Sequence, residues 1–145
     1  MNAYKELKDR HQKEMNAFPL GAAFSDKQFA EMMRKWGLTE NDADKICSIG
    51  AGCFIRKCDK ERFFEMLERF KRERKEAIAA DKTGNGYIYD MFLYELANHE
   101  YCITYDLEET LDALGITVDE VNADKRLLHG LQKARKAYLK NCNDY

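Results

Sequence analysis

The chain has 145 residues, a formal net charge of −2, 34% charged residues and a single proline, Pro19. A chain of this length fits one domain, and the scarcity of proline favours long helices. No run of about 18 apolar residues occurs and the first residues are polar and charged, so the sequence predicts neither a membrane span nor a signal peptide. We therefore expect one cytoplasmic domain covering residues 1–145.

The five cysteines are an odd number in a chain without an export signal, which favours reduced thiols. Cys47, Cys53 and Cys58 lie six and five residues apart, wider than the CxxC spacing of a zinc knuckle. The three histidines are scattered along the chain. The sequence therefore predicts no structural zinc site and no cofactor.

Apolar residues three to four positions apart predict helices along most of the chain. The expected helices cover residues 1–18, 25–37, 39–47, 59–80, 88–99, 106–115, one or two turns after residue 117, and 125–141. Capping residues stand at the start of several of them: Ser25, Thr39, Asp59, Asp106 and Thr117. The longest helix is expected to bury a stripe that contains Phe63, Phe64, Leu67 and Phe70.

Gly50 and Gly52 predict a packed turn, because the spacing and the following residues of a phosphate-binding loop are absent. The pieces Cys53–Arg56 and Tyr101–Tyr105 are compatible with short strands that could pair. We predict a mainly α, compact single-domain bundle of about six or seven helices, with a small two-stranded β pairing left open. Within the last helix, Gly130 is expected to be a weak point.

Residues 83–124 contain no lysine or arginine and carry ten carboxylates, whereas the flanks hold all 24 basic residues and 16 acidic ones. Many apolar residues lie between these charges, which excludes a disordered acidic tail. We expect a folded, negatively charged face. The best candidates for its exposed part lie in two short capped helices: Glu108, Glu109, Asp112, Asp119 and Glu120.

The loop that begins at Asp81 looks like an EF-hand calcium loop, with Gly-Asn-Gly-Tyr-Ile at its centre. Its twelfth position, where calcium needs a bidentate carboxylate, is Phe92, and its third position is Thr83. We expect no bound metal and a helix–turn–helix connector in which Gly84 and Gly86 relieve strain.

Residues 29–46 have the length of a DNA-reading helix-turn-helix, with Gly37 at the turn. The second helix would carry Glu40, Asp42 and Asp44, which repel phosphates. The sequence therefore argues against DNA reading by this element.

Glu95 and His99 lie four residues apart on one helical face, with Glu100 and Cys102 beyond them. No second histidine, metal-binding motif or nucleophile turn accompanies this group. We expect a core histidine that shares a proton with a neighbouring carboxylate, and we predict that the protein is not an enzyme.

Three passages of the chain resemble a known family: DKICSIGAGCFIRK at 44–57, AIAADKTGNGYIYDMF at 77–92, and YELANHEYCITYDLEETLDALG at 94–115. They are similar to an uncharacterised family of small proteins encoded on phages, plasmids and conjugative elements of gut Firmicutes. The resemblance runs from about Phe24 to Ala137, and Cys53 departs from it where the family has glycine. It implies a mobile-element cargo protein and carries over no catalytic residues.

Two classes of function follow as expectations. The first is a non-enzymatic protein that binds a basic macromolecular partner through the acidic face, with a host nucleic-acid or defence enzyme as a candidate target. The second is an accessory nucleic-acid-binding protein that uses the basic residues around 56–82 and 125–140, against which stand interleaved acids and the lack of a reader motif. A charge asymmetry that only keeps the fold soluble is the third interpretation.

Overall fold

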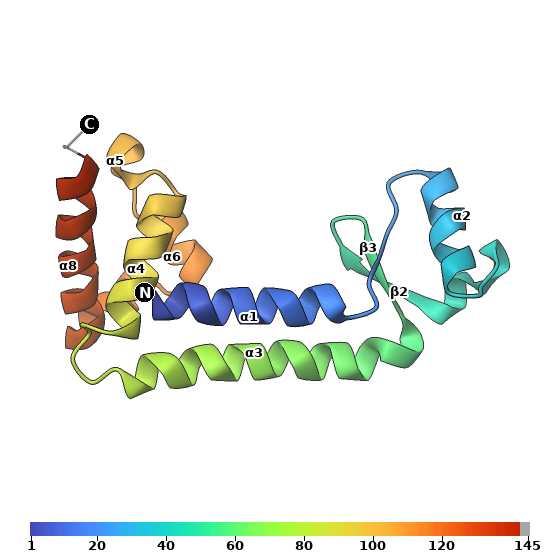
Figure 1. The fold of residues 1–145 in the computed structure, drawn as a ribbon, viewed down its shortest axis with the longest axis horizontal. Helices are drawn as coiled ribbons and strands as arrows, with labels where there is room; N and C mark the ends of the chain where they lie inside the picture. Colours follow the sequence, from blue (N-terminus) through green and yellow to red (C-terminus); the bar gives the residue numbers. More distant parts are fainter. Residues whose placement is uncertain (143–145) are drawn as a thin grey trace. The chain divides into compact units, whose positions relative to one another are not determined.

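Helices form over most of the chain where apolar residues recur at helical spacing, so the predicted mainly α class is confirmed (Figure 1). The computed structural model describes residues 1–142. Their elements are α1 (Ala3–Ala17), β1 (Gly21–Ala22), α2 (Asp26–Lys35), the 3-10 helix η1 (Glu40–Lys45), β2 (Ile46–Gly50), β3 (Cys53–Arg56), the 3-10 helix η2 (Lys57–Asp59), α3 (Lys60–Ala80), α4 (Tyr87–Asn98), α5 (Tyr101–Thr104), α6 (Glu108–Leu114), α7 (Val118–Ala123) and α8 (Lys125–Cys142). These residues thus contain eight α-helices, slightly more than expected.

Contacts between residues divide the chain into two compact units. Unit 1 comprises Met1–Arg10 and Arg72–Tyr145, and unit 2 comprises His11–Lys71. The helices α1 and α3 each contribute one part to each unit. The expectation that residues 1–145 act as one domain stays a prediction.

Unit 2 holds a small sheet beside the helix α2. The predicted cap of α2 is confirmed, because the Ser25 hydroxyl accepts a hydrogen bond of 3.2 Å from the Gln28 amide. Met32 and Met33 of α2 are buried and form a small core with Ile46. This core is what holds α2 against the chain that follows it.

The sheet has three antiparallel strands in the order β1-β3-β2. The helix expected over residues 39–47 is wrong at its end, since the 3-10 helix η1 stops at Lys45 and Ile46 begins β2. Ile46 lies opposite Arg56 in the ladder, so strand pairing overrides the local helical pattern. The expected packed turn at Gly50 and Gly52 is confirmed as the connection between β2 and β3, with positive φ at both glycines.

The long helix α3 buries only part of its expected stripe. Phe63 and Phe70 are buried in unit 2, and Phe70 stacks on the His11 ring with 4.1 Å between ring centroids. Leu67 is half-buried and Phe64 is 47% exposed, so the expectation for Phe64 is wrong. Successive residues are about 100° apart around a helix, so Phe64, directly after the buried Phe63, lies off the side that α3 buries.

Ahead of α3, Asp59 is buried at 3% exposure and holds two arginines. Its carboxylate accepts hydrogen bonds from Arg56 Nε and Arg62 Nη2, both three residues away. Asp59 therefore acts as a salt-bridge centre at the start of the helix, where the sequence suggested a cap.

In unit 1 the helices α4 and α8 lie side by side, as Figure 1 shows. The core of unit 1 consists of Tyr4, Ile88, Met91, Phe92, Leu96, Tyr101, Leu111, Val121, Leu127, Leu131 and Ala134. Gly130 of α8 is buried, and a Cβ there would lie 2.5 Å from Ile88 Cγ2. Gly130 is therefore a point of close approach between the two helices, which outweighs the weakness expected from its low helix propensity.

The strand left open at Tyr101–Tyr105 does not form, because residues 101–104 form the one-turn helix α5. The strand β3, its expected partner, is already paired on both edges by β1 and β2. Glu100 and Tyr105 flank α5 in the left-handed region, with φ of 51° and 53°. Tyr101 anchors α5, since it is 2% exposed and its hydroxyl accepts a 2.8 Å bond from Arg135 Nη2.

Candidate functional site

The five candidate carboxylates lie on two short helices of unit 1. Glu108, Glu109 and Asp112 belong to α6, and Asp119 and Glu120 belong to the first turn of α7. All five side chains are exposed to solvent. Each is therefore accessible to a partner, although binding through them stays a prediction.

The direction of the α6 carboxylates follows from what the helix buries. Thr110 and Leu111 are buried against unit 1, at 0% and 5% exposure. The Thr110 hydroxyl donates a 3.4 Å hydrogen bond to the Glu95 carbonyl oxygen of α4. These contacts fix the inner side of α6, so its three acidic residues occupy the outer side.

The capping signals around these helices are partly confirmed. Thr117 caps α7 as predicted, because its hydroxyl accepts a 3.1 Å hydrogen bond from the Glu120 amide. The capping box predicted at Asp106 is wrong, since Leu107 is the residue before α6 and makes no side-chain cap. The Asp106 carboxylate instead accepts a 2.9 Å bond from the Glu108 amide, which forms a local turn.

Three of the ten carboxylates in residues 83–124 serve the fold, which corrects the expectation of a single face carrying all ten. Asp90 accepts a 2.9 Å bond from the Ala3 amide at the start of α1. Asp124 forms a 2.8 Å ion pair with Arg126. Glu95 is buried at 1% exposure. The exposed acidic residues of this stretch are Glu100, Asp106 and the five candidate carboxylates.

Glu95 is the centre of a buried polar cluster. Its Oε1 accepts a 2.7 Å hydrogen bond from the Tyr4 hydroxyl and a 3.2 Å bond from Lys8 Nζ, both on α1. Its Oε2 accepts a 3.3 Å bond from Asn98. Burial by itself raises the pKa of Glu95, but these donors together outweigh burial and leave the pKa below its ordinary value. Glu95 is therefore an ionised, hydrogen-bonded core residue.

His99 stands between this cluster and the outer side of α6. Its Nε2 lies 3.2 Å from Glu95 Oε2, but that nitrogen has no hydrogen-bond partner within the described part of the chain. Its Nδ1 lies 3.5 Å from Glu109 Oε2. His99 is thus half-buried between two carboxylates, and the expected core histidine that shares a proton with a carboxylate is wrong, because its Nε2 makes no hydrogen bond to Glu95.

The hydrogen bonds observed for Glu95 and Cys102 join each of them to other residues and not to one another. The Cys102 thiol accepts a 3.2 Å hydrogen bond from Tyr138 of α8, and Glu95 receives its bonds from α1 and α4. Sequence analysis missed Tyr4, which is 91 residues from Glu95, because helical spacing identifies a buried face but not its partner. Whether the protein has an activity stays untested by this geometry.

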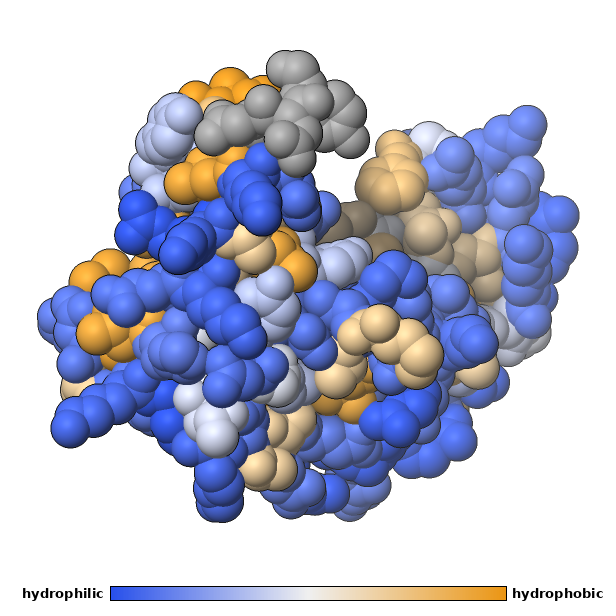
Figure 2. All heavy atoms as spheres, turned by 60° about the vertical axis from the view of Figure 1, so that its left-hand side comes forward, coloured by the Kyte–Doolittle hydropathy of each residue, from blue (hydrophilic) through white to orange (hydrophobic). Residues whose placement is uncertain are grey.

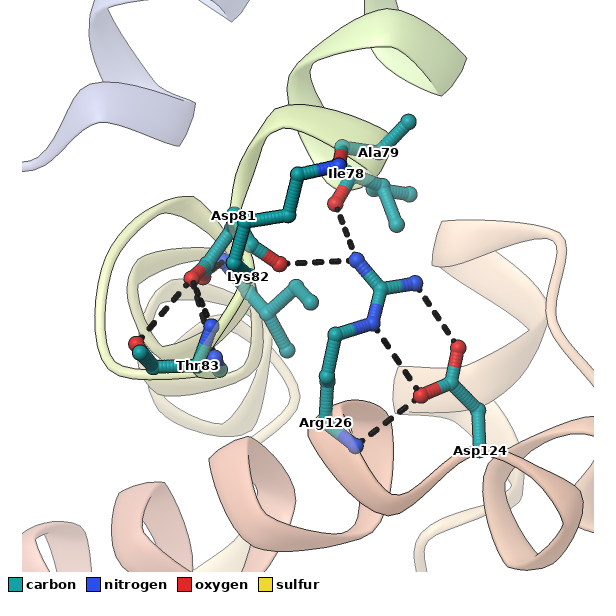
Figure 3. A network of polar contacts seen from close by, with 9 residues as sticks. Ile78, Ala79, Asp81, Lys82, Thr83, Asp124 and Arg126 are labelled. Atoms are coloured by element: carbon teal, nitrogen blue, oxygen red, sulfur yellow. Dashed lines mark hydrogen bonds and ion pairs between the residues drawn. The ribbon is translucent and has the colours of Figure 1, made fainter.

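The loop after α3 closes on its own aspartate. Asp81 accepts hydrogen bonds of 2.9 to 3.2 Å from the backbone amides of Thr83, Gly84, Gly86 and Ile88 (Figure 3 shows the contact with Thr83). Burial raises the pKa of Asp81, but the four amides outweigh it and hold the pKa below its ordinary value. The carboxylate that would bind calcium in an EF-hand therefore organises the loop directly.

Two further positions of the calcium-like loop are engaged elsewhere. Phe92, at the twelfth position, is a core residue with 0% exposure. The Asn85 side-chain oxygen lies 2.8 Å from His129 Nε2 and accepts a 3.2 Å bond from Lys133. Among residues 1–142 no group of three or more histidine, cysteine or acidic side chains is arranged to hold a metal ion.

Arg126 at the start of α8 ties this loop to the end of α3. Its Nη1 donates to the carbonyl oxygens of Ile78 at 3.0 Å and Asp81 at 2.7 Å, as Figure 3 shows. Its other nitrogens bond Asp124, and this hydrogen bond raises the pKa of the guanidinium. The basic group thus satisfies carbonyls that a helix leaves unpaired at its C-terminus.

Several basic residues of α3 and α8 are engaged within their own unit. In α8, Lys133 lies 4.8 Å from the Tyr89 ring centroid and Arg135 bonds Tyr101. In α3, Arg69 forms a 2.9 Å ion pair with Glu14, and Arg72 lies 4.0 Å from Glu76. The two ion pairs offset part of the positive charge that α3 offers to a nucleic acid, whereas contacts with tyrosines do not offset the charge of α8.

The helix-turn-helix interpretation of residues 29–46 also fails on geometry. After α2 and Gly37 the chain forms η1, a 3-10 helix of six residues capped by Thr39. A reader of this class needs an α-helix that lies in the major groove. Residues 40–45 do not form that α-helix, and the expectation that this element does not read DNA stays a prediction.

Figure 2 shows a face covered mostly by hydrophilic residues, with hydrophobic residues in separate groups.

Within residues 1–142, none of the helices has the length and apolar character needed to cross a bilayer.

A family model described as "Family of unknown function (DUF7659)" matches residues 3–137. The chain belongs to the DUF7659 family. The match begins earlier than the resemblance at about Phe24 suggested, because it includes α1, whose Tyr4 and Lys8 bond Glu95. No curated protein and no solved structure matches this DUF7659 chain.

Proposed function

We propose that this DUF7659 protein is a non-enzymatic accessory protein of a mobile genetic element, and that it binds a basic macromolecular partner in the cytoplasm. The surface we assign to binding consists of Glu108, Glu109, Asp112, Asp119 and Glu120. The observation that carries the proposal is that all five are exposed in a stretch of 42 residues without lysine or arginine. Their charge is not neutralised by basic neighbours in the sequence.

Contacts within unit 1 support the same assignment. Among the described residues, Glu109 is the one of these five with a basic side chain in contact, and that partner is the imidazole of His99 at 3.5 Å. The other carboxylates of the stretch that contact basic groups, Glu95 and Asp124, are used for the fold. A surface of unpaired like charges costs stability through self-repulsion, which a basic partner would relieve.

The candidate partner is a protein with a cationic groove that normally accepts phosphates, such as a host nucleic-acid or defence enzyme. Carboxylates on two successive short helices offer such a groove several negative charges, and long-range attraction would speed the encounter. The phage, plasmid or conjugative-element origin suggested by the resemblance fits an accessory protein that acts on host enzymes.

A charge swap tests the proposal. The tagged chain is used to capture partners from its host, and the captured protein is then purified for affinity measurements. Changing Glu108, Glu109 and Asp112 to lysine should abolish binding, and wild-type affinity should fall as salt rises from about 50 to 500 mM. The matched control changes three exposed glutamates of unit 2, Glu31, Glu65 and Glu68, to lysine.

The two variants separate a local surface from net charge. Both alter the charge by the same amount, and both are checked by melting temperature before binding is measured. Unchanged affinity and salt dependence in the folded α6 variant would refute the proposal. Binding of duplex DNA or RNA that disappears when Lys125, Lys136 and Lys140 are changed to glutamate would favour the accessory nucleic-acid-binding alternative.

A further inference from the structure

Two cysteines of unit 1 meet around one tyrosine hydroxyl. The Tyr138 hydroxyl of α8 donates a 3.2 Å hydrogen bond to Cys102 Sγ, and the Cys102 amide lies 3.5 Å from the same oxygen. Cys142 follows Tyr138 by four residues on α8, so the two side chains are neighbours on one helix face. The Cys142 thiol is in side-chain contact with both Cys102 and Tyr138.

The fold holds Cys102 firmly at this position. Its helix α5 has a single turn between the left-handed residues Glu100 and Tyr105. Tyr101, the preceding residue, is buried and bonded to Arg135 of α8. The helix α5 is therefore attached to α8 through Tyr101 and Cys102, which holds Cys102 on the side of α8 that carries Tyr138 and Cys142.

The two thiols differ in their environment. The hydrogen bond from Tyr138, followed by that from Cys142, lowers the pKa of Cys102 below its ordinary value. The contact with Cys102, followed by burial, raises the pKa of Cys142. A thiolate reacts as the nucleophile in oxidation, so Cys102 is the thiol that reacts first and Cys142 the one that follows.

We propose that Cys102 and Cys142 form a reactive dithiol site that reduces a peroxide and closes to an intramolecular disulfide between α5 and α8. The Cys102 thiolate attacks one peroxide oxygen, the O–O bond breaks, and hydroxide leaves as water after it takes a proton. The Cys142 sulfur then attacks the oxidised Cys102 sulfur, and its S–O bond breaks to release a second water. Two thiols lose two electrons, and one hydrogen peroxide becomes two waters.

The other three cysteines provide an internal comparison. Cys47 and Cys53 lie in the sheet of unit 2, and Cys58 is the exposed cysteine of η2. Exposure alone would make Cys58 the most reactive toward peroxide. The proposed site predicts the opposite order, because the half-buried Cys102 accepts a hydrogen bond from Tyr138 and has the half-buried Cys142 one turn beyond that tyrosine on α8.

Peptide mapping of the wild-type full chain gives the primary test. The reduced protein is treated with a few equivalents of hydrogen peroxide, alkylated and digested. We expect a linked pair of peptides containing Cys102 and Cys142, a chain mass lower by about 2 Da for two lost hydrogens, and full reversal by dithiothreitol. Oxidation confined to Cys58, or a link between other cysteines, would overturn the proposal.

Variants then test the assigned roles. Cys102→Ser and Cys142→Ser should each lose the linked peptides, whereas Cys58→Ser should keep them at the wild-type rate. Cys142→Ser should also leave a Cys102 sulfenic acid that a dimedone probe labels. Tyr138→Phe removes the donor and should slow formation of the link severalfold while the helical circular-dichroism spectrum is unchanged. An unchanged rate in folded Tyr138→Phe would show that the hydroxyl has no part in the site.

Discussion

Gly130 of α8 lies against Ile88 of α4, so close that a single added methyl group would meet Ile88 Cγ2 at 2.5 Å and the Gly84 carbonyl oxygen at 2.9 Å. Both Gly130 and Ile88 are buried in unit 1. The packing of α4 against α8 therefore depends on the absence of a side chain at position 130.

Gly130→Ala should destabilise the protein, although alanine favours helices more than glycine. Alanine gains about 1 kcal/mol in helix propensity over glycine. Overpacking of a well-packed core costs about 1–3 kcal/mol, and the contact of 2.5 Å places this cost toward the upper part of that range. Urea unfolding measures the free energy. Ile88→Ala provides the matched partner, because the double variant should lose less stability than the two single losses combined. A higher melting temperature for Gly130→Ala would refute the close approach.

Phe70→Ala should cost about 3–5 kcal/mol of unfolding free energy, because Phe70 is buried and stacks on His11. The sequence alone suggested Leu67→Ala as the decisive change, at about 2–5 kcal/mol, but Leu67 is half-buried and should cost less. Phe64→Ala is the control on the same helix, since Phe64 is 47% exposed. Equal losses for Phe64 and Phe70 would contradict the assigned face of α3.

Glu95→Gln should lower stability near neutral pH by about 1–3 kcal/mol, since it weakens charged hydrogen bonds in the core. The pKa of Glu95 in the folded state lies below its ordinary value of 4.5. Its contribution is therefore fully present above about pH 4.5 and is lost as the pH falls through the folded-state pKa. The difference between wild type and variant should shrink over that range in urea unfolding.

The control for this pH dependence is Glu65→Gln, an exposed glutamate of α3. It should change stability little at any pH. A Glu95→Gln deficit that stays the same well below pH 4.5 would mean that the ionised carboxylate is not what stabilises the cluster.

Calcium should leave the melting temperature unchanged, with or without a chelator, because a ligand that bound the native state would raise it. Asp81→Ala should nevertheless lower stability by about 1–3 kcal/mol, since four backbone amides lose their acceptor. Asp81→Asn keeps one acceptor oxygen, so its stability should lie between those of the wild type and Asp81→Ala. A calcium-dependent rise in melting temperature that Asp81→Ala abolishes would show that the loop binds the ion.

Local signals were sufficient where the deciding contacts lie within a few residues. Ser25, Thr39 and Thr117 cap helices as predicted, because each hydroxyl accepts a bond from an amide two or three residues later. Neighbouring residues also predicted the mainly α class and the turn between Gly50 and Gly52. The sequence likewise showed that the twelfth position of the calcium-like loop is Phe92, which the structure buries in the core. The exposure of the five candidate carboxylates agrees with their place in short, charged helices.

Tertiary structure decided what depends on residues distant in the chain. Residues 101–104 form a helix that is bonded to Arg135 and Tyr138 of α8, contacts that lie more than 30 residues away in the chain. The buried Glu95 receives hydrogen bonds from Tyr4 and Lys8 of α1, which are 91 and 87 residues away in the chain. Gly130 changes from a weak position to a required one where α4 meets α8. Helical spacing identifies which face is buried, but the partner of that face is set by packing between elements, which spacing does not encode.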